Sequence, residues 1–242
     1  MGWPPLPPWP RTVAELVAMQ DALARAVPPP WDGLPELGRV AGCFVCFERG
    51  RGGPGAGGDP GWAAACLVPP SGEPVTRVVR GPAGAPYEPG LLALREGGLL
   101  EAALRALPQV PDLLVVNATG RDHQRRAGLA LQLGARRGVP SIGVTSRPLL
   151  GGGPPPDDRQ GATSVLRIGD EIVAYRVRTR RGTRPLVAHA GWRTDPHQAV
   201  ELVLRLTPRW RTPLPLRVAR QAARIARAAV GGDESKSVTH EQ

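Results

Sequence analysis

The chain has 242 residues, of which 41% are apolar, and its formal net charge at pH 7 is +10. A chain of this length forms one large domain or two small ones, and its apolar share is sufficient for a buried core. No apolar run approaches the ~18 residues of a membrane-spanning helix. The first residues lack the pattern of a signal peptide, and three cysteines give no even disulfide set, so the sequence predicts a cytoplasmic protein without membrane contact.

The positive charge comes almost entirely from arginine, because Lys236 is the only lysine among 31 basic residues. A basic surface attracts polyanions, which favours DNA or RNA as the partner. The alternative is a codon bias, since the chain is also rich in glycine (31) and proline (29). The sequence leaves the oligomeric state open, and we expect a monomer.

The N-terminal half predicts a helix followed by three strands. Residues 1–9 form a lead-in rich in proline and tryptophan. Residues 12–27 carry apolar side chains at helical spacing, with Thr12 as the N-cap and Glu15 three residues later. Strands that form an antiparallel meander are expected at residues 39–48, 62–69 and 74–81.

The first of these strands contains a C-x-x-C spacing, which raises the question of a zinc or redox site. Residues three apart on a strand point to opposite faces and lie ~10 Å apart, too far for a disulfide. A zinc site usually needs four ligands, and Cys66 supplies no second pair. We therefore interpret Cys43, Cys46 and Cys66 as buried structural cysteines.

The remainder of the chain alternates helices with strands. Short apolar runs at residues 111–117 and 140–146 are typical of strands that are buried on both faces. The apolar spacing predicts helices at 91–107, 125–138, 193–206 and 216–229, strands at 164–168 and 171–178, and a disordered tail at 231–242.

This order of elements describes an α/β domain with a mixed sheet, antiparallel meander plus parallel strands, flanked by helices. No linker separates two cores, so we expect one domain over residues 10–230. Ligands of such sheets bind beyond the carboxyl ends of the strands. Those ends fall near residues 44–48, from Asn117 onward and from Val144 onward.

Four collinear blocks resemble the endonuclease V family. They are "RVAGCFVCFE" (39–48), "GAPYEPGLLALRE" (84–96), the run from "PDLLVVN" to "SRPLLG" (111–151), and "GTRPLVAHAGWRTDPHQAVELVLRL" (182–206). The resemblance implies a ribonuclease H-like fold. It also implies metal-dependent cleavage of DNA or RNA on the 3′ side of deoxyinosine or inosine, with carboxylates that hold Mg²⁺ against the scissile phosphate.

Most of the family's catalytic positions carry other residues here. The resemblance retains Glu96 as the one metal-binding carboxylate and His123 as the loop histidine, whereas Asn117 stands at the end of the buried strand in place of an aspartate. The remaining catalytic positions fall on Phe44 and His197, where the family has aspartates, on Ser146, where it has lysine, and on Trp192, where it has histidine. The resemblance therefore implies an incomplete Mg²⁺ site.

Three other acidic residues are candidates to replace the missing carboxylates. Glu48 shares a strand face with Phe44 but lies ~13 Å along the strand. Asp122 follows Asn117 in a loop and could reach inward. Asp195 precedes a helix and is interpreted as its N-cap.

The resemblance retains more of the substrate-facing frame. "PYEPG" (86–90) matches the family wedge that separates strands at the lesion, and Tyr87 in it can stack on an exposed base. The alternative is an ordinary Pro-Gly turn with a surface tyrosine. We interpret the arginines at helical spacing in residues 217–227 as a solvated face and His189 as structural. The residues assigned to nucleic-acid binding are Tyr87, Pro89, Gly90, Gly120, Arg125, Arg126 and Gly143.

Three functions remain open from the sequence. The first is a catalytically impaired endonuclease V-like protein that binds inosine-containing or single-stranded nucleic acid. The second is an active metal-dependent endonuclease of nucleic-acid repair, with the metal held by Glu96, Asn117 and either Asp122 or His123. The third is an interaction protein without a nucleic-acid partner.

Overall fold

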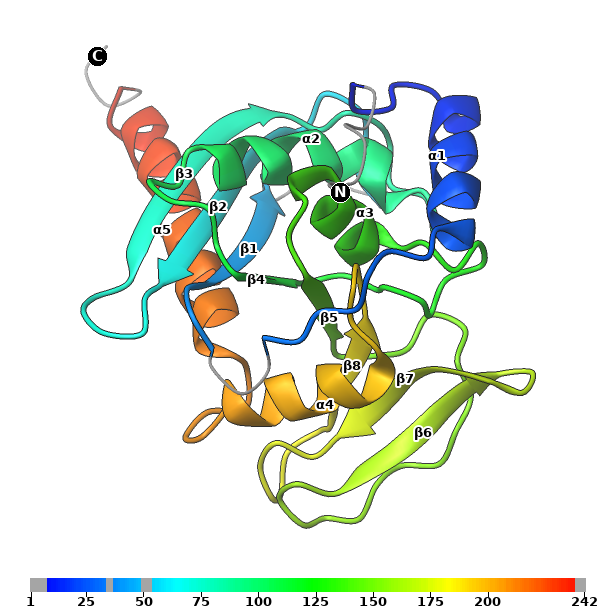
Figure 1. The fold of residues 1–242 in the computed structure, drawn as a ribbon. Coiled ribbons are helices and arrows are strands. Elements are labelled where there is room, and N and C mark those ends of the chain that lie inside the picture. Colours follow the sequence, from blue (N-terminus) through cyan, green and yellow to red (C-terminus); the bar gives the residue numbers. More distant parts are fainter. Residues whose placement is uncertain (1–7, 34–36, 49–53, 238–242) are drawn as a thin grey trace.

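One mixed sheet of eight strands forms the centre of the computed structural model, which describes residues 8–33, 37–48 and 54–237 (Figure 1). The strand order is β3-β2-β1-β4-β5-β8-β7-β6. The strands are β1 (Val40–Phe47), β2 (Pro60–Val68), β3 (Val75–Pro82), β4 (Leu113–Val116), β5 (Ser141–Thr145), β6 (Thr163–Ile168), β7 (Glu171–Val177) and β8 (Leu186–Ala190).

The sheet combines the two kinds of pairing that the sequence predicts. β1, β2 and β3 form an antiparallel meander, while β4 lies parallel to β1 and β5 parallel to β4. β8 returns antiparallel to β5 and continues into an antiparallel set with β7 and β6. The sequence does not predict β8, because His189 interrupts the apolar run of its five buried residues.

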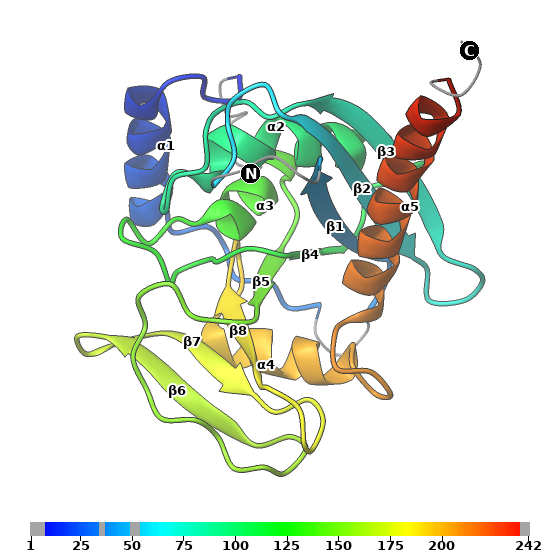
Figure 2. The ribbon, with the colours of Figure 1, turned by 180° about the vertical axis from the view of Figure 1, so that it is seen from behind.

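Helices cover both faces of the sheet. The first three helices pack on one face and share a core with β1 and β4, whereas the last two pack on the other face (Figures 1 and 2). Their bounds are α1 (Val13–Arg25), α2 (Leu92–Arg105), α3 (Leu129–Arg137), α4 (Pro196–Arg205) and α5 (Leu214–Ser237). Within the described ranges, no helix is both long and apolar enough to cross a membrane.

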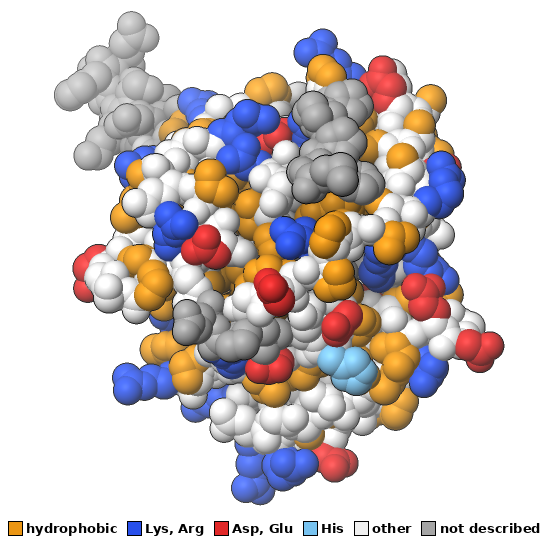
Figure 3. Space-filling model, viewed as in Figure 1, with side chains coloured by type: hydrophobic (Ala, Val, Ile, Leu, Met, Phe, Trp, Pro, Cys, Tyr) orange, Lys and Arg blue, Asp and Glu red, His pale blue; other side chains and the backbone are white. Residues whose placement is uncertain are grey.

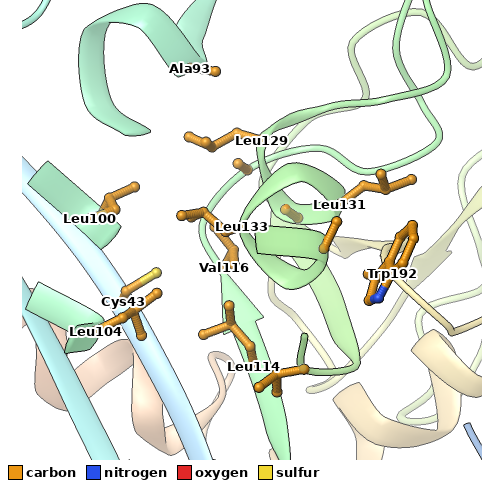
Figure 4. Packing of buried hydrophobic residues seen from close by; sticks show 14 of the residues in the cluster. Cys43, Ala93, Leu100, Leu104, Leu114, Val116, Leu129, Leu131, Leu133 and Trp192 are labelled. Carbon is orange, nitrogen blue, oxygen red and sulfur yellow. The ribbon is translucent and has the colours of Figure 1, made fainter. Parts of the chain in front are cut away.

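The cysteines confirm the strand interpretation of the C-x-x-C segment. Cys43 lies near Leu100 and Leu104 of α2 in the cluster on one face (Figure 4), whereas Cys46 and Cys66 belong to the cluster under α5 on the opposite face. All three cysteines are buried. Burial raises the pKa of the Cys66 thiol to about 11, so this thiol stays protonated at neutral pH.

Two of the predicted caps are present. Thr12 and Glu15 form a capping box at the start of α1, and Asp195 forms one with Gln198 at the start of α4. The Asp195 carboxylate accepts a hydrogen bond from the backbone N–H of Gln198 at 2.9 Å. It therefore caps the helix and does not serve as a metal ligand.

Several predicted boundaries were wrong. α3 begins at Leu129 rather than at 125, because the chain forms turns until Gly128 serves as the N-cap. α5 continues to Ser237, so residues 231–237 of the expected disordered tail are helical. Trp9 of the expected lead-in packs on α2, where its indole donates a hydrogen bond to Ala93 at 2.9 Å. The other lead-in residues up to 7, and the tail after 237, lie outside the described residues.

The capping box of α4 provides a test of how the second half of the fold is stabilised. We expect Asp195→Ala to lower the free energy of unfolding by about 1 kcal/mol, since helix amides lose their acceptor. Glu201→Ala on the same helix is the matched control, because Glu201 makes only an exposed ion pair with Arg205 at 3.9 Å. Urea denaturation measures both, and equal losses in the two variants would contradict the role of the cap.

Candidate nucleic-acid interface

A cavity of about 160 Å³ lies beyond the carboxyl end of β4, at the edge of the sheet where the sequence places the ligand. The segment between β3 and α2, the loop after β4 and the helices α1 and α3 enclose it. Of the expected site residues, the structure brings together Tyr87, Pro89, Gly90, Asn117 and His123 at this cavity.

The 86–90 segment forms one wall of the cavity, and hydrogen bonds to its backbone hold it in place. Tyr87 is 44% exposed at the rim, and Gly90 has a positive φ of 83° that disfavours any side chain. The Gly90 carbonyl accepts hydrogen bonds from Gln20 Nε2 at 3.1 Å and from His123 Nε2 at 3.0 Å. The exposed tyrosine ring is thus carried on a fixed turn.

His123 braces this turn and is not free to bind a metal. The backbone N–H of Arg125 donates to His123 Nδ1 at 3.1 Å, so the ring proton resides on Nε2 and is donated to Gly90. Burial is the main cause that lowers the pKa of the imidazole. Both nitrogens of the neutral ring are therefore occupied by backbone groups, unlike the catalytic role expected from the sequence.

Arg95 fixes the base of the same segment, a role that sequence reasoning missed. Its buried guanidinium pairs with Asp59 at 2.9 Å and donates to the carbonyls of Ala56 and Ala85 at 2.6 and 3.0 Å. These bonds join the loop before β2 to the chain that leads into the 86–90 turn. The signal was present in the sequence, since an arginine on an otherwise apolar helix face needs buried partners.

The other residues assigned to binding have different positions. Gly120 and Gly143 do not line the cavity: they allow close backbone approach, since a Cβ would meet the Ala190 and Ala118 carbonyls at 1.8 and 2.2 Å. Arg125 and Arg126 precede α3 instead of starting it, which corrects the sequence prediction. Arg126 adopts a positive φ of 54° and pairs with Glu171 at 2.6 Å on the surface.

Asp122 does not replace a missing metal ligand. Its carboxylate is fully buried and accepts three backbone N–H bonds, from Leu149, Leu150 and Gly151, at 2.7 to 2.9 Å. His189 lies nearby with Nδ1 3.8 Å from Asp122 Oδ2, and burial lowers the pKa of this imidazole to about 4. The pair shapes the loop after β5, which agrees with the structural interpretation of His189.

The resemblance places the family's first metal ligand at Phe44, and the strand register gives the location of this residue. β1 and β4 pair in parallel from Val40 with Leu113 to Cys43 with Val116. The next residue on each strand is Phe44 or Asn117, and neighbours in register point to the same face. Phe44 packs in the cluster under α5, and the Arg220 guanidinium lies 5.1 Å from the centre of its ring. An aromatic ring and a cation therefore occupy this position.

The retained carboxylate of Glu96 approaches β1 from α2, near the thiol of Cys43, whose pKa it helps to raise. Burial raises the pKa of Glu96 to about 7. Among the residues that the structure describes, no three His, Cys, Asp or Glu side chains lie close enough to hold a metal ion. Trp192 is buried in the core, and His197 hydrogen-bonds Tyr175 at 3.2 Å on the other face of the sheet.

A buried amide in the cavity wall was also missed by sequence reasoning. Gln132 of α3 is 1% exposed and donates to the Ala127 carbonyl at 2.7 Å, while its Oε1 has no partner. The carbonyl of Ala127 fixes the orientation of the amide, so the open position is an acceptor. A lone glutamine within the apolar run of α3 was the available signal.

The mixed sheet, the helices on both faces and the cleft at the carboxyl ends of β1 and β4 define a ribonuclease H-like protein. A sequence model described as endonuclease V matches residues 37–221. Endonuclease V of Nocardia farcinica is 38% identical over 92% of this chain and 96% of its own. The crystal structure of the Streptomyces avermitilis endonuclease V has a TM-score of 0.79 at 34% identity, covering 93% of this chain and 96% of that one.

The chain belongs to the endonuclease V family. The fold also matches the Ciona intestinalis endonuclease V, solved in complex with DNA that contains an inosine, with a TM-score of 0.74 at 19% identity over 90% of this chain and 98% of that one.

The raised pKa of Glu96 gives a pH-dependent prediction. The folded state holds this proton between the ordinary pKa of 4.5 and about 7, whereas the unfolded state has released it. Stability is therefore lost as the pH rises through this window. We expect Glu96→Gln to be more stable than the wild type by about 1–3 kcal/mol at pH 8 and by much less at pH 4.5.

Denaturation curves at several pH values measure this difference. Glu73→Gln in the exposed β2–β3 turn is the control with the same change of side chain. A Glu96→Gln difference that is constant from pH 4.5 to 8 would contradict the penalty on the buried carboxylate.

Proposed function

We propose that this endonuclease V family protein binds inosine-containing or single-stranded nucleic acid and that its metal-dependent cleavage is impaired. The observation that carries the proposal is Phe44, with the guanidinium of Arg220 over its ring. This pair stands where the resemblance places the first metal-binding aspartate. Neither side chain offers an oxygen to a cation.

The chemistry of the neighbouring donors does not fit Mg²⁺. Magnesium requires oxygen ligands in a near-octahedral arrangement, with carboxylates supplying most of the charge. Asn117 provides at most a neutral carbonyl, and Glu96 is about half protonated at neutral pH because its pKa is raised to about 7. The Arg220 guanidinium, whose central carbon lies 5.1 Å from the centre of the Phe44 ring, would repel a divalent ion bound beside that ring. No hydrolytic step through a metal is therefore assigned to this site.

Binding of a nucleic-acid strand is better supported by the residues around the cavity than metal-dependent cleavage is. The exposed ring of Tyr87 sits on a rigid turn, where it can stack on a base. The unpartnered Oε1 of Gln132 is an acceptor that a ring N–H of a bound base would satisfy, and hypoxanthine carries such an N–H where adenine has a bare nitrogen. The Ciona protein is seen with inosine-containing DNA, which is a precedent for this fold.

A nicking assay tests the impairment directly. We expect no cut in single-stranded DNA or RNA that carries one inosine, with either Mg²⁺ or Mn²⁺, under conditions in which an active family member cuts to completion. A cut on the 3′ side of inosine that disappears in Glu96→Ala would show that the site works around Glu96, and the proposed impairment would be wrong.

The wedge is tested by binding. We expect Tyr87→Ala to weaken the affinity for an inosine-containing strand by the ~1–3 kcal/mol of one stacked base, while Tyr87→Phe, which keeps the ring, binds nearly as the wild type. Fluorescence anisotropy with a labelled strand measures both variants. Unchanged affinity in Tyr87→Ala would remove the wedge role, and failure of the wild type to bind any strand would favour a protein without a nucleic-acid partner.

A further inference from the structure

The four arginines at helical spacing on α5 were expected to form a solvated face, but the structure gives them different environments. Arg217 stacks on the exposed ring of Trp210 at 4.0 Å, and Arg227 donates to the Phe47 carbonyl at 3.1 Å. Arg224 is exposed. Only Arg220 lies over Phe44, at the family's metal position.

Arg220 is a half-buried cation without an anion. Its Nε is buried and donates to no partner, and the guanidinium makes no ion pair with any carboxylate in the described part of the chain. The nearby charges are Arg211 and Arg224, which, together with burial, lower the pKa of Arg220. By contrast, the buried Arg95 and Arg136 pair with Asp59 and Glu101 at 2.9 and 3.0 Å. An uncompensated guanidinium is unfavourable unless a ligand supplies the anion.

The surroundings indicate a phosphate as that anion. Phe44 and Asn117 each follow the last paired residues of β1 and β4, Cys43 and Val116, and Asn117 also lines the cavity beside the 86–90 turn. We infer from this register that the guanidinium lies near the proposed path of the strand. Guanidinium groups bind phosphates with two parallel hydrogen bonds. The charges that act on Arg220 are those of Arg224 and Arg211, so its surroundings are basic. On the face shown in Figure 3, by comparison, basic side chains are interspersed with acidic ones.

We propose that Arg220 binds a backbone phosphate of the nucleic-acid strand directly, at the place where the family's metal ion would stand between protein and phosphate. The inference rests on the proposed function. Phe44 supports the guanidinium as a flat platform on one side, leaving its N–H edge for the phosphate. The site thus keeps a positive charge toward the strand and has no metal-bound water to cut it.

Salt-dependent binding of a single-stranded, inosine-containing oligonucleotide tests this role. We expect Arg220→Gln to weaken binding about tenfold at low salt and to reduce the slope of log K against log salt by about 0.7, the value for one phosphate contact on a single strand. Arg220→Lys should keep the slope and lose part of the affinity, since it retains charge without the bidentate geometry.

The matched control is Arg167→Gln, which removes one charge from the exposed edge strand β6, far from α5 in the sheet order. It should leave the slope unchanged, and equal thermal midpoints establish that each variant is folded. A wild-type affinity and slope in Arg220→Gln would overturn the role of Arg220 while leaving the proposed function intact. A wild type that binds no strand would overturn both.

Restoring carboxylates gives a second test that does not depend on activity. We expect Phe44→Asp with Asn117→Asp to show no thermal shift with Mg²⁺, because the Arg220 guanidinium would pair with the introduced carboxylate. Adding Arg220→Gln to these two changes should produce a Mg²⁺-dependent shift. If the double variant responds to Mg²⁺ as strongly as the triple variant, Arg220 does not occupy the metal position and the inference is wrong.

Discussion

The in-register pairing of β1 with β4 determines the geometry of the whole cleft. The two strands stay together as far as Cys43 and Val116, and then β4 ends while β1 continues beside β2. The first residues past this point, Phe44 and Asn117, therefore stand side by side at the opening between the strands. A shift of one strand by one residue would turn its side chain to the opposite face from that of its partner. The chemical nature of the site thus depends on what these two positions carry.

Charged side chains around the cavity have partners of opposite charge or backbone donors, whereas those beside β1 at the centre of the site do not. Arg95 is neutralised by Asp59, and the Asp122 carboxylate is surrounded by backbone N–H groups. These networks are complete, and satisfied buried groups make a structure rigid. At the centre, Glu96 and Arg220 approach β1 from helices on opposite faces, each without a described ion-pair partner. The networks of Arg95 and Asp122 therefore hold the surrounding loops rigidly. Under the proposed function, a ligand would balance the charges at the centre of the site.

The sequence predicted the elements better than the contacts between them. Periodicity and capping residues identified the meander, the buried parallel strands and the cap at Asp195, because these depend on neighbours along the chain. β8 escaped detection since His189 interrupts its short apolar run. The role of His123 depends on Gly90, and the environment of Arg220 depends on Phe44. Such long-range pairs leave no local pattern, so a stripe of arginines at helical spacing was interpreted as solvated.

In the proposed function, an aromatic–arginine pair stands where the resemblance places a carboxylate–metal pair, and this difference changes one property of the site and preserves another. A divalent ion held by carboxylates presents positive charge to a phosphate and also lowers the pKa of a bound water, which makes the nucleophile. A guanidinium over Phe44 presents positive charge without open coordination positions, and its proton is not released at physiological pH. Attraction to the strand and activation of water are therefore separable in this fold. Because Tyr87 and the braced 86–90 turn would act on the base and not on the phosphate, the proposed recognition does not depend on metal-assisted cleavage.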